Sequence, residues 1–100
     1  MKKLLFLTVL IISIAALLAP TLAQEKPTLT ATTTINVRSA PSVNANQIGT
    51  LSQGASRTIY GKNANGFWLQ ISYEGQHGWV CAALTEINGG LDTVPVSDTT

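Results

Sequence analysis

The side chains most capable of catalytic chemistry are a cysteine and a histidine that stand four positions apart. Cys81 and His77 are the only residues of their types in the chain, and a thiol beside an imidazole can act as a nucleophile. On one strand, however, four residues span about 13 Å at about 3.3 Å per residue, which is far beyond hydrogen-bonding distance. No third residue is placed to orient the histidine, and one histidine, one cysteine and scattered carboxylates do not make a metal site. We therefore expect no enzyme, no cofactor and no metal centre.

The single cysteine has two other interpretations. Because Cys81 has no partner within the chain, it cannot form an intramolecular disulfide. It is either a small, partly buried filler of the fold or the site of a disulfide between two chains.

The aromatic residues are candidates for ligand binding rather than for catalysis. In "FWLQIS", Trp68 alternates with Leu69 and therefore shares a face with Gln70 and Ser72. An exposed tryptophan offers a peptide or sugar a large rigid surface at low entropic cost. The alternative is a tryptophan that covers the seam of the fold or packs on the C-terminal segment. The expected ligand-binding residues are Trp68, Trp79, Tyr60, Tyr73, Arg38 and Gln70.

Arg38 is the last residue of one alternating strand pattern, and Phe67 is the first residue of another. The Arg38 guanidinium could bind a ligand carboxylate in a bidentate manner, or it could be solvated or tied to carbonyl groups of the following loop. Phe67 lies either in the core or beside the binding groove, depending on how strongly its strand twists.

The elements that must position these residues are short strands. Period-two alternation with β-branched and aromatic residues predicts five of them, at residues 29–38, 47–51, 56–63, 67–72 and 79–82. Turns are expected at 52–54, 63–66 and 74–78, and one helical turn within 83–87. We expect the interior to be filled by Ile35, Val37, Ile48, Leu51, Ile59, Leu69, Ile71, Val80 and Leu84. Short strands without an amphipathic helix predict an all-β fold, a small closed or orthogonally packed barrel.

The N-terminus has the pattern of a secretory signal peptide. Lys2 and Lys3 precede an apolar run that ends near Pro20, and small residues lead to Ala23. The alternative is an uncleaved membrane anchor. Cleavage after Ala23 would remove two of the six basic residues and leave a nearly neutral chain, which argues against a nucleic-acid partner. We expect a signal peptide at 1–23, a linker at 24–29, one domain at 30–87 and a C-terminal tail at 88–100.

Several short motifs stand in an order that resembles the bacterial SH3 domain family, also called SH3b. They are "INVRSAPS", "IGTLSQG", "YGKNANGFWLQI", "GQHGWV" and "AAL", spread over residues 30–87. The resemblance implies a five-stranded SH3-like barrel. It also implies that the loop after Arg38 borders a ligand groove near Trp68.

Such a domain implies a non-catalytic module that attaches an exported protein to cell-wall peptide or to another extracytoplasmic ligand. Binding of proline-rich peptides is not expected, because the paired aromatic side chains that this mode needs are missing. The alternative is a structural or assembly protein that pairs with an exported partner by an edge strand or through a Cys81 disulfide.

Overall fold

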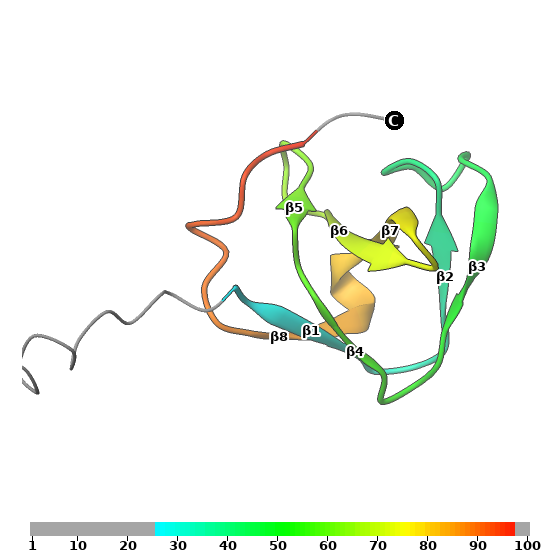
Figure 1. Cartoon of the computed structure of the whole chain (residues 1–100), viewed down its shortest axis with the longest axis horizontal. Coiled ribbons are helices and arrows are strands. Elements are labelled where there is room, and N and C mark those ends of the chain that lie inside the picture. Colours follow the sequence, from blue (N-terminus) through cyan, green and yellow to red (C-terminus); the bar gives the residue numbers. More distant parts are fainter. Residues whose placement is uncertain (1–25, 98–100) are drawn as a thin grey trace, which may run out of the picture.

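The computed structural model describes residues 26–97, which are built almost entirely of β-strands (Figure 1). Along the chain the elements are β1 Thr28–Ala31, β2 Ile35–Arg38, β3 Gln47–Leu51, β4 Ser56–Thr58, β5 Gly61–Lys62, β6 Trp68–Tyr73, β7 Gln76–Cys81, the 3-10 helix η1 Ala82–Leu84 and β8 Thr85–Asn88. The expected signal peptide at 1–23 lies outside the described residues. Among the residues described, no helix has both the length and the apolar character needed to cross a membrane.

The strands form two antiparallel sheets. The smaller has the order β4-β1-β8 and the larger the order β3-β2-β7-β6-β5. The hydrophobic core takes side chains from both sheets, as expected when each sheet buries one face against the other. The prediction of an all-β fold is therefore confirmed.

Two of the expected strands are each divided between the sheets. The alternating stretch 29–38 bends at 32–34, so β1 pairs in the smaller sheet and β2 in the larger one. In the same way the chain leaves the smaller sheet after β4 and joins the larger one at β5, a path that is visible in green in Figure 1. Alternation continues through both bends and therefore could not reveal them.

The C-terminal half differs from prediction in two places. The turn after β6 contains only Glu74 and Gly75, both with positive φ, which is typical of a two-residue hairpin turn. As a result β7 begins at Gln76 rather than at residue 79. The helical turn is only Ala82–Leu84, and the residues after it form β8, because they pair with β1.

Most of the expected interior is confirmed. Buried residues include Ile35, Val37, Leu51, Ile59, Leu69, Ile71 and Val80. Ile48 is partly buried and packs against them. Leu84 was expected inside, but it is exposed. It ends η1, which has no buried residue, and contributes its backbone instead, since its carbonyl accepts hydrogen bonds from the amide and hydroxyl of Thr32.

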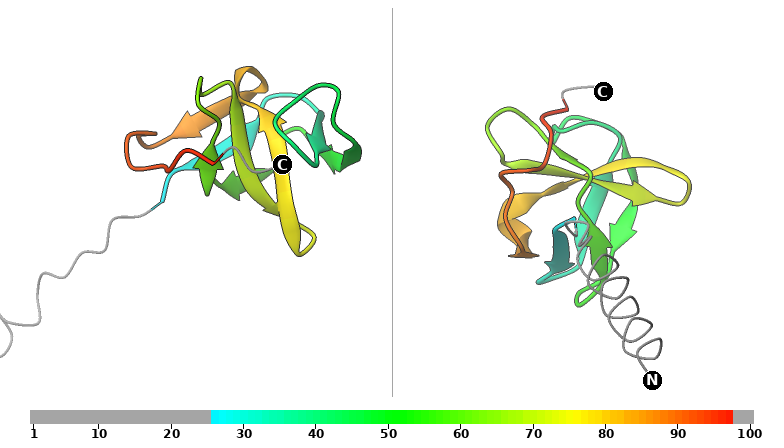
Figure 2. Two further views of the ribbon diagram at one scale, coloured as in Figure 1. Left: turned by 90° about the horizontal axis from the view of Figure 1, so that it is seen from above. Right: turned by 60° about the vertical axis from the view of Figure 1, so that its left-hand side comes forward.

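The segment after β8 docks on the barrel. Val94 is 6% exposed and belongs to the core, while Leu91 packs against it. Lys62 holds the segment at three points: its amide donates to the Pro95 carbonyl (3.0 Å), its carbonyl accepts from the Ser97 amide (2.7 Å), and its Nζ donates to the Leu91 carbonyl (2.8 Å). Figure 2 shows this segment, in orange and red, running along one side of the barrel.

Candidate functional site

Strand register gathers most of the expected ligand-binding residues on one face of the larger sheet. Trp68 lies opposite Cys81, and Trp79 lies between Gln70 on β6 and Arg38 on β2. Directly opposite residues of antiparallel strands share a face, with Cβ atoms about 5 Å apart. Leu69, Ile71 and Val80 alternate with the paired residues and fill the core. The paired residues therefore occupy the outer face of the sheet. We call this set of five residues the Trp68 face.

The members of the Trp68 face differ sharply in exposure. Trp79 is 1% exposed and Gln70 is 6% exposed, whereas Trp68, Cys81 and Arg38 are partly buried. Trp79 and Gln70 therefore belong to the face but have almost no surface available for a ligand. Of the two expected tryptophans, only Trp68 retains accessible surface.

Gln70 is covered because its neighbour on β5 is a glycine. Gly61 lies opposite Gln70, and a Cβ at Gly61 would be 2.8 Å from Gln70 Oε1 and 3.3 Å from Ser97 Cβ. The absence of a side chain at Gly61 thus leaves space for the glutamine and for the docked C-terminal segment. Alternation placed Gln70 on the outer face but gave no indication of this cover.

Arg38 is tied to the loop that follows it. Its Nη1 donates to the Ala45 carbonyl at 3.1 Å. The loop closes further through Ser39, whose amide donates to the Asn46 carbonyl at 2.9 Å. The structure therefore shows Arg38 tied to a carbonyl group of the following loop, which was one of its interpretations from the sequence.

The turn before β6 presents the most exposed aromatic side chain of the described residues. Phe67 is 67% exposed and lies just before the first residue of β6. Two hydrogen bonds fix the turn from within: the Phe67 amide donates to Asn65 Oδ1 (2.9 Å), and the Trp68 amide donates to Asn63 Oδ1 (3.0 Å). A third joins the turn to helix η1, because the Phe67 carbonyl accepts from the Ala82 amide (2.8 Å). A large apolar side chain on a rigid turn is well suited to anchor a ligand.

Phe67 was expected either in the core or beside the binding groove, and it was not among the residues predicted to bind the ligand. Alternation placed it on the inner face with Leu69 and Ile71, but the strand begins one residue later, so the alternation does not extend to it. The asparagine-glycine pair at 65–66 was the available signal, because it places the turn immediately before Phe67. Leu84 of the neighbouring helix η1 is also exposed at this end of the sheet.

The bacterial SH3 domain model matches residues 33–86, more than half of the chain. The chain belongs to the bacterial SH3 domain family. The two antiparallel sheets are the SH3-like fold that this membership implies, and the family is one of binding modules that are generally non-catalytic. A search of curated proteins finds no match to this chain.

Tyr73 lies on the other side of the SH3 sheet from the Trp68 face. Its ring covers Gly49, where a Cβ would approach ring carbons to 2.6 and 2.7 Å, and its hydroxyl donates to the Thr50 carbonyl at 3.2 Å. Its packing is therefore that of a structural residue that fastens β3 to the end of β6.

Tyr60 is exposed but also lies apart from the Trp68 face. The Nζ atom of Lys26 stands 4.6 Å from the centre of its ring, a cation–π geometry. Tyr60 lines a small hollow of about 150 Å³ together with Pro27, Val94 and Pro95. It thus marks the junction of the N- and C-terminal segments of the SH3 domain.

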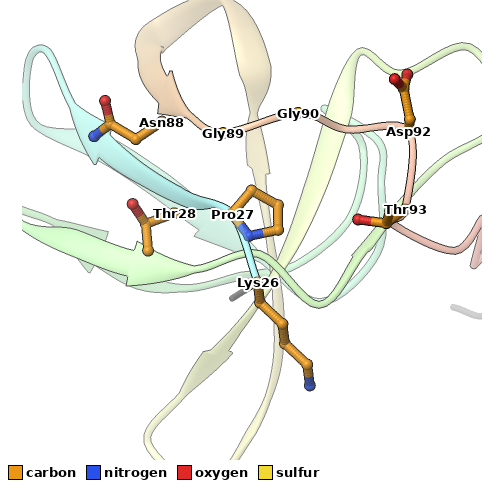
Figure 3. Close-up of a pocket in the computed structure, with 8 residues that line it drawn as sticks. All are labelled: Lys26, Pro27, Thr28, Asn88, Gly89, Gly90, Asp92 and Thr93. Atoms are coloured by element: carbon orange, nitrogen blue, oxygen red, sulfur yellow. The ribbon is translucent and has the colours of Figure 1, made fainter. Parts of the chain in front are cut away.

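A larger hollow of about 500 Å³ lies beside this junction (Figure 3). Its wall contains Lys26, Thr28, Asn88 and Asp92, but it contains none of the aromatic candidates and no residue of the Trp68 face. Because no polar group of the wall is buried, the hollow does not have the character of a preformed ligand site.

His77 and Cys81 both lie on β7, although a turn was expected at His77. His77 lies opposite Ser72, and Cys81 lies opposite Trp68. Within residues 26–97, no group of three or more histidine, cysteine, aspartate and glutamate side chains is close enough to hold a metal ion. Among these residues the Trp68 face and the neighbouring Phe67 are the arrangement best suited to bind a partner.

Proposed function

We propose that this SH3 domain is an extracytoplasmic binding module without catalytic activity, and that it recognises cell-wall peptide through Phe67 and the Trp68 face. The family of binding modules and the signal-like pattern of residues 1–23 support the general role. The observation that carries the placement of the site is Phe67, which is largely exposed on a hydrogen-bonded turn beside Trp68.

The chemistry of this face suits a short extended peptide. Aromatic side chains have few rotatable bonds and therefore lose little entropy when a flexible ligand packs on them. Arg38, on the same face, supplies a positive charge that suits the carboxylates of such a peptide. Trp79 and Gln70, buried beneath, keep the surface rigid.

Co-sedimentation of the full chain with purified cell-wall sacculi tests the proposal. We expect the wild-type protein to sediment with sacculi and Phe67→Ala to be retained about tenfold less, because an aromatic anchor contributes about 1 to 2 kcal/mol or more to binding. Since Phe67 is exposed, the variant should keep the wild-type melting temperature. Trp68→Ala should also lose retention, but its partial burial makes a parallel melting curve necessary.

Tyr60→Ala is the matched control, because Tyr60 is also an exposed aromatic residue but lies away from the Trp68 face. Equal losses for Phe67→Ala and Tyr60→Ala would contradict the placement of the site. Failure of the folded wild-type protein to sediment would contradict wall binding itself.

An assembly role through Cys81 is the second candidate, and one observation favours it. Cys81 is unpaired and partly exposed on the Trp68 face, so a disulfide between two chains would cover the same surface. Mass measurement with and without reductant distinguishes the two roles. A reductant-sensitive dimer that vanishes in Cys81→Ser would favour assembly.

A further inference from the structure

The chain contains two asparagine-glycine pairs, Asn65-Gly66 and Asn88-Gly89, and the structure places them in very different settings. We propose that Asn88, and not Asn65, is a site of spontaneous deamidation in the folded protein. Both pairs share the same local chemistry, because a glycine leaves the preceding asparagine unhindered. The difference between them must therefore come from the fold.

The reaction proceeds through a cyclic imide. The backbone nitrogen of Gly89 attacks Cγ of Asn88, a new N–Cγ bond forms, and the side-chain nitrogen leaves as ammonia with the proton of the glycine amide. Water then opens the ring at one of its two carbonyl groups. Opening gives either aspartate or isoaspartate, in which the main chain runs through Cγ. In total one water is consumed and one ammonia released.

At Asn65 both reacting groups are held in hydrogen bonds. The Gly66 amide nitrogen, which would be the nucleophile, donates to the Asn63 carbonyl at 2.9 Å. The Asn65 side chain is fixed because its Oδ1 accepts from the Phe67 amide at 2.9 Å. Closing the imide ring would require breaking this turn, which also holds the first residues of β6.

At Asn88 these restraints are missing. Asn88 ends β8, and its pairing with Thr28 is the last pair of that ladder, so Gly89 lies beyond the strand. Within the described part of the chain, neither the Asn88 side chain nor the Gly89 amide makes a hydrogen bond. Both residues are exposed.

Water has direct access to the same place. Asn88 and Gly89 line the open hollow of about 500 Å³, and Figure 3 shows them side by side on its wall. The hollow therefore supplies the water that opens the imide.

The product would change the junction between β8 and the docked C-terminal segment. Gly89 packs closely on Pro27, since a Cβ at Gly89 would lie 3.2 Å from Pro27 Cβ. Isoaspartate lengthens the main chain at this contact, and either product adds a negative charge near Asp92. We expect the deamidated fraction to melt at a lower temperature than the intact protein.

The test is incubation of the full chain at mildly alkaline pH, followed by digestion with a protease that cleaves after glutamate and by mass spectrometry. Cleavage after Glu74 and Glu86 separates the two asparagines onto different peptides. We expect conversion at Asn88 to be roughly twentyfold faster than at Asn65, because the two hydrogen bonds at Asn65 each slow the reaction about fivefold.

The same incubation in denaturant is the control, where the two rates should become nearly equal. Asn88→Gln should abolish conversion in its peptide, and Asn63→Ala, which removes one bond of the turn, should accelerate Asn65. Conversion at Asn65 that equals or exceeds conversion at Asn88 in the folded protein would overturn the proposal.

Discussion

The inner and outer faces of the β6–β7 hairpin are built from alternating residues of the same two strands, yet they depend on different parts of the molecule. The inner face carries Leu69, Ile71 and Val80, all completely buried. The outer face carries Trp68 and Trp79, one partly accessible and the other 1% exposed. These three inner positions are uniformly buried, whereas exposure on the outer face changes between adjacent pairs.

The difference arises from what covers each face. The inner face packs against the second sheet, so every inward position meets apolar neighbours. Next to the outer face lie two separate chain segments rather than a sheet. One is the loop that Arg38 holds, and the other is the C-terminal segment, whose Ser97 lies beside Gly61. A face that is covered by segments rather than by a sheet therefore has buried and accessible positions side by side.

The largest expected effect is the loss of an inner-face side chain. Leu69→Ala should lower the free energy of unfolding by about 2 to 5 kcal/mol, because it removes a fully buried side chain and leaves a cavity. Denaturant unfolding measures it. Ser72→Ala, an exposed outer position on the same strand, should change the free energy by less than about 0.5 kcal/mol. Similar costs at the two positions would refute the contrast between the faces.

A second test concerns Tyr73, which fastens the edge of the larger sheet. Gly49→Ala should cost about 1 to 3 kcal/mol, because the new Cβ would overlap the Tyr73 ring. In a Tyr73→Leu background the added cost of Gly49→Ala should fall close to zero, as a double-mutant cycle of unfolding free energies would show. An unchanged cost would mean that Tyr73 is not the obstacle.

The smallest of these stability effects concerns the docked C-terminal segment. Val94→Ala should cost about 1.5 kcal/mol, since two buried methyl groups are lost. Val96→Ala is the matched control, because Val96 is exposed two residues further on and should be nearly neutral. If thermal unfolding shows no loss for Val94→Ala, the segment does not contribute to the core in solution.

The sequence predicted much of the fold, and particular residues show where it did not. Alternation and β-branched composition identified the β-strand regions through Cys81 and most of the interior, because burial on one face of a strand leaves a period-two pattern. It failed at Leu84, which was expected in the interior but ends a short helix that has no buried residue. It also failed at Thr85–Asn88, whose strand character comes from pairing with β1.

The candidate site was predictable only in part. Alternation within one strand placed Trp68 and Gln70 on the same face. The positions of Trp79 and Arg38 on that face follow from the order and register of the strands in the SH3 fold. The exposure of Phe67 depends on the residue at which β6 begins, and the burial of Gln70 depends on a glycine in the neighbouring strand.

The sequence by itself determined that the chain forms short strands with one apolar face, and its motifs indicated the SH3 family. The tertiary structure decided which outward positions remain accessible, that Lys62 and the core hold the C-terminal segment, and which of two identical asparagine-glycine pairs is open to attack. The physical reason is that alternation records only the side of the strand on which a residue lies. Exposure on the outer side depends on segments distant in the chain.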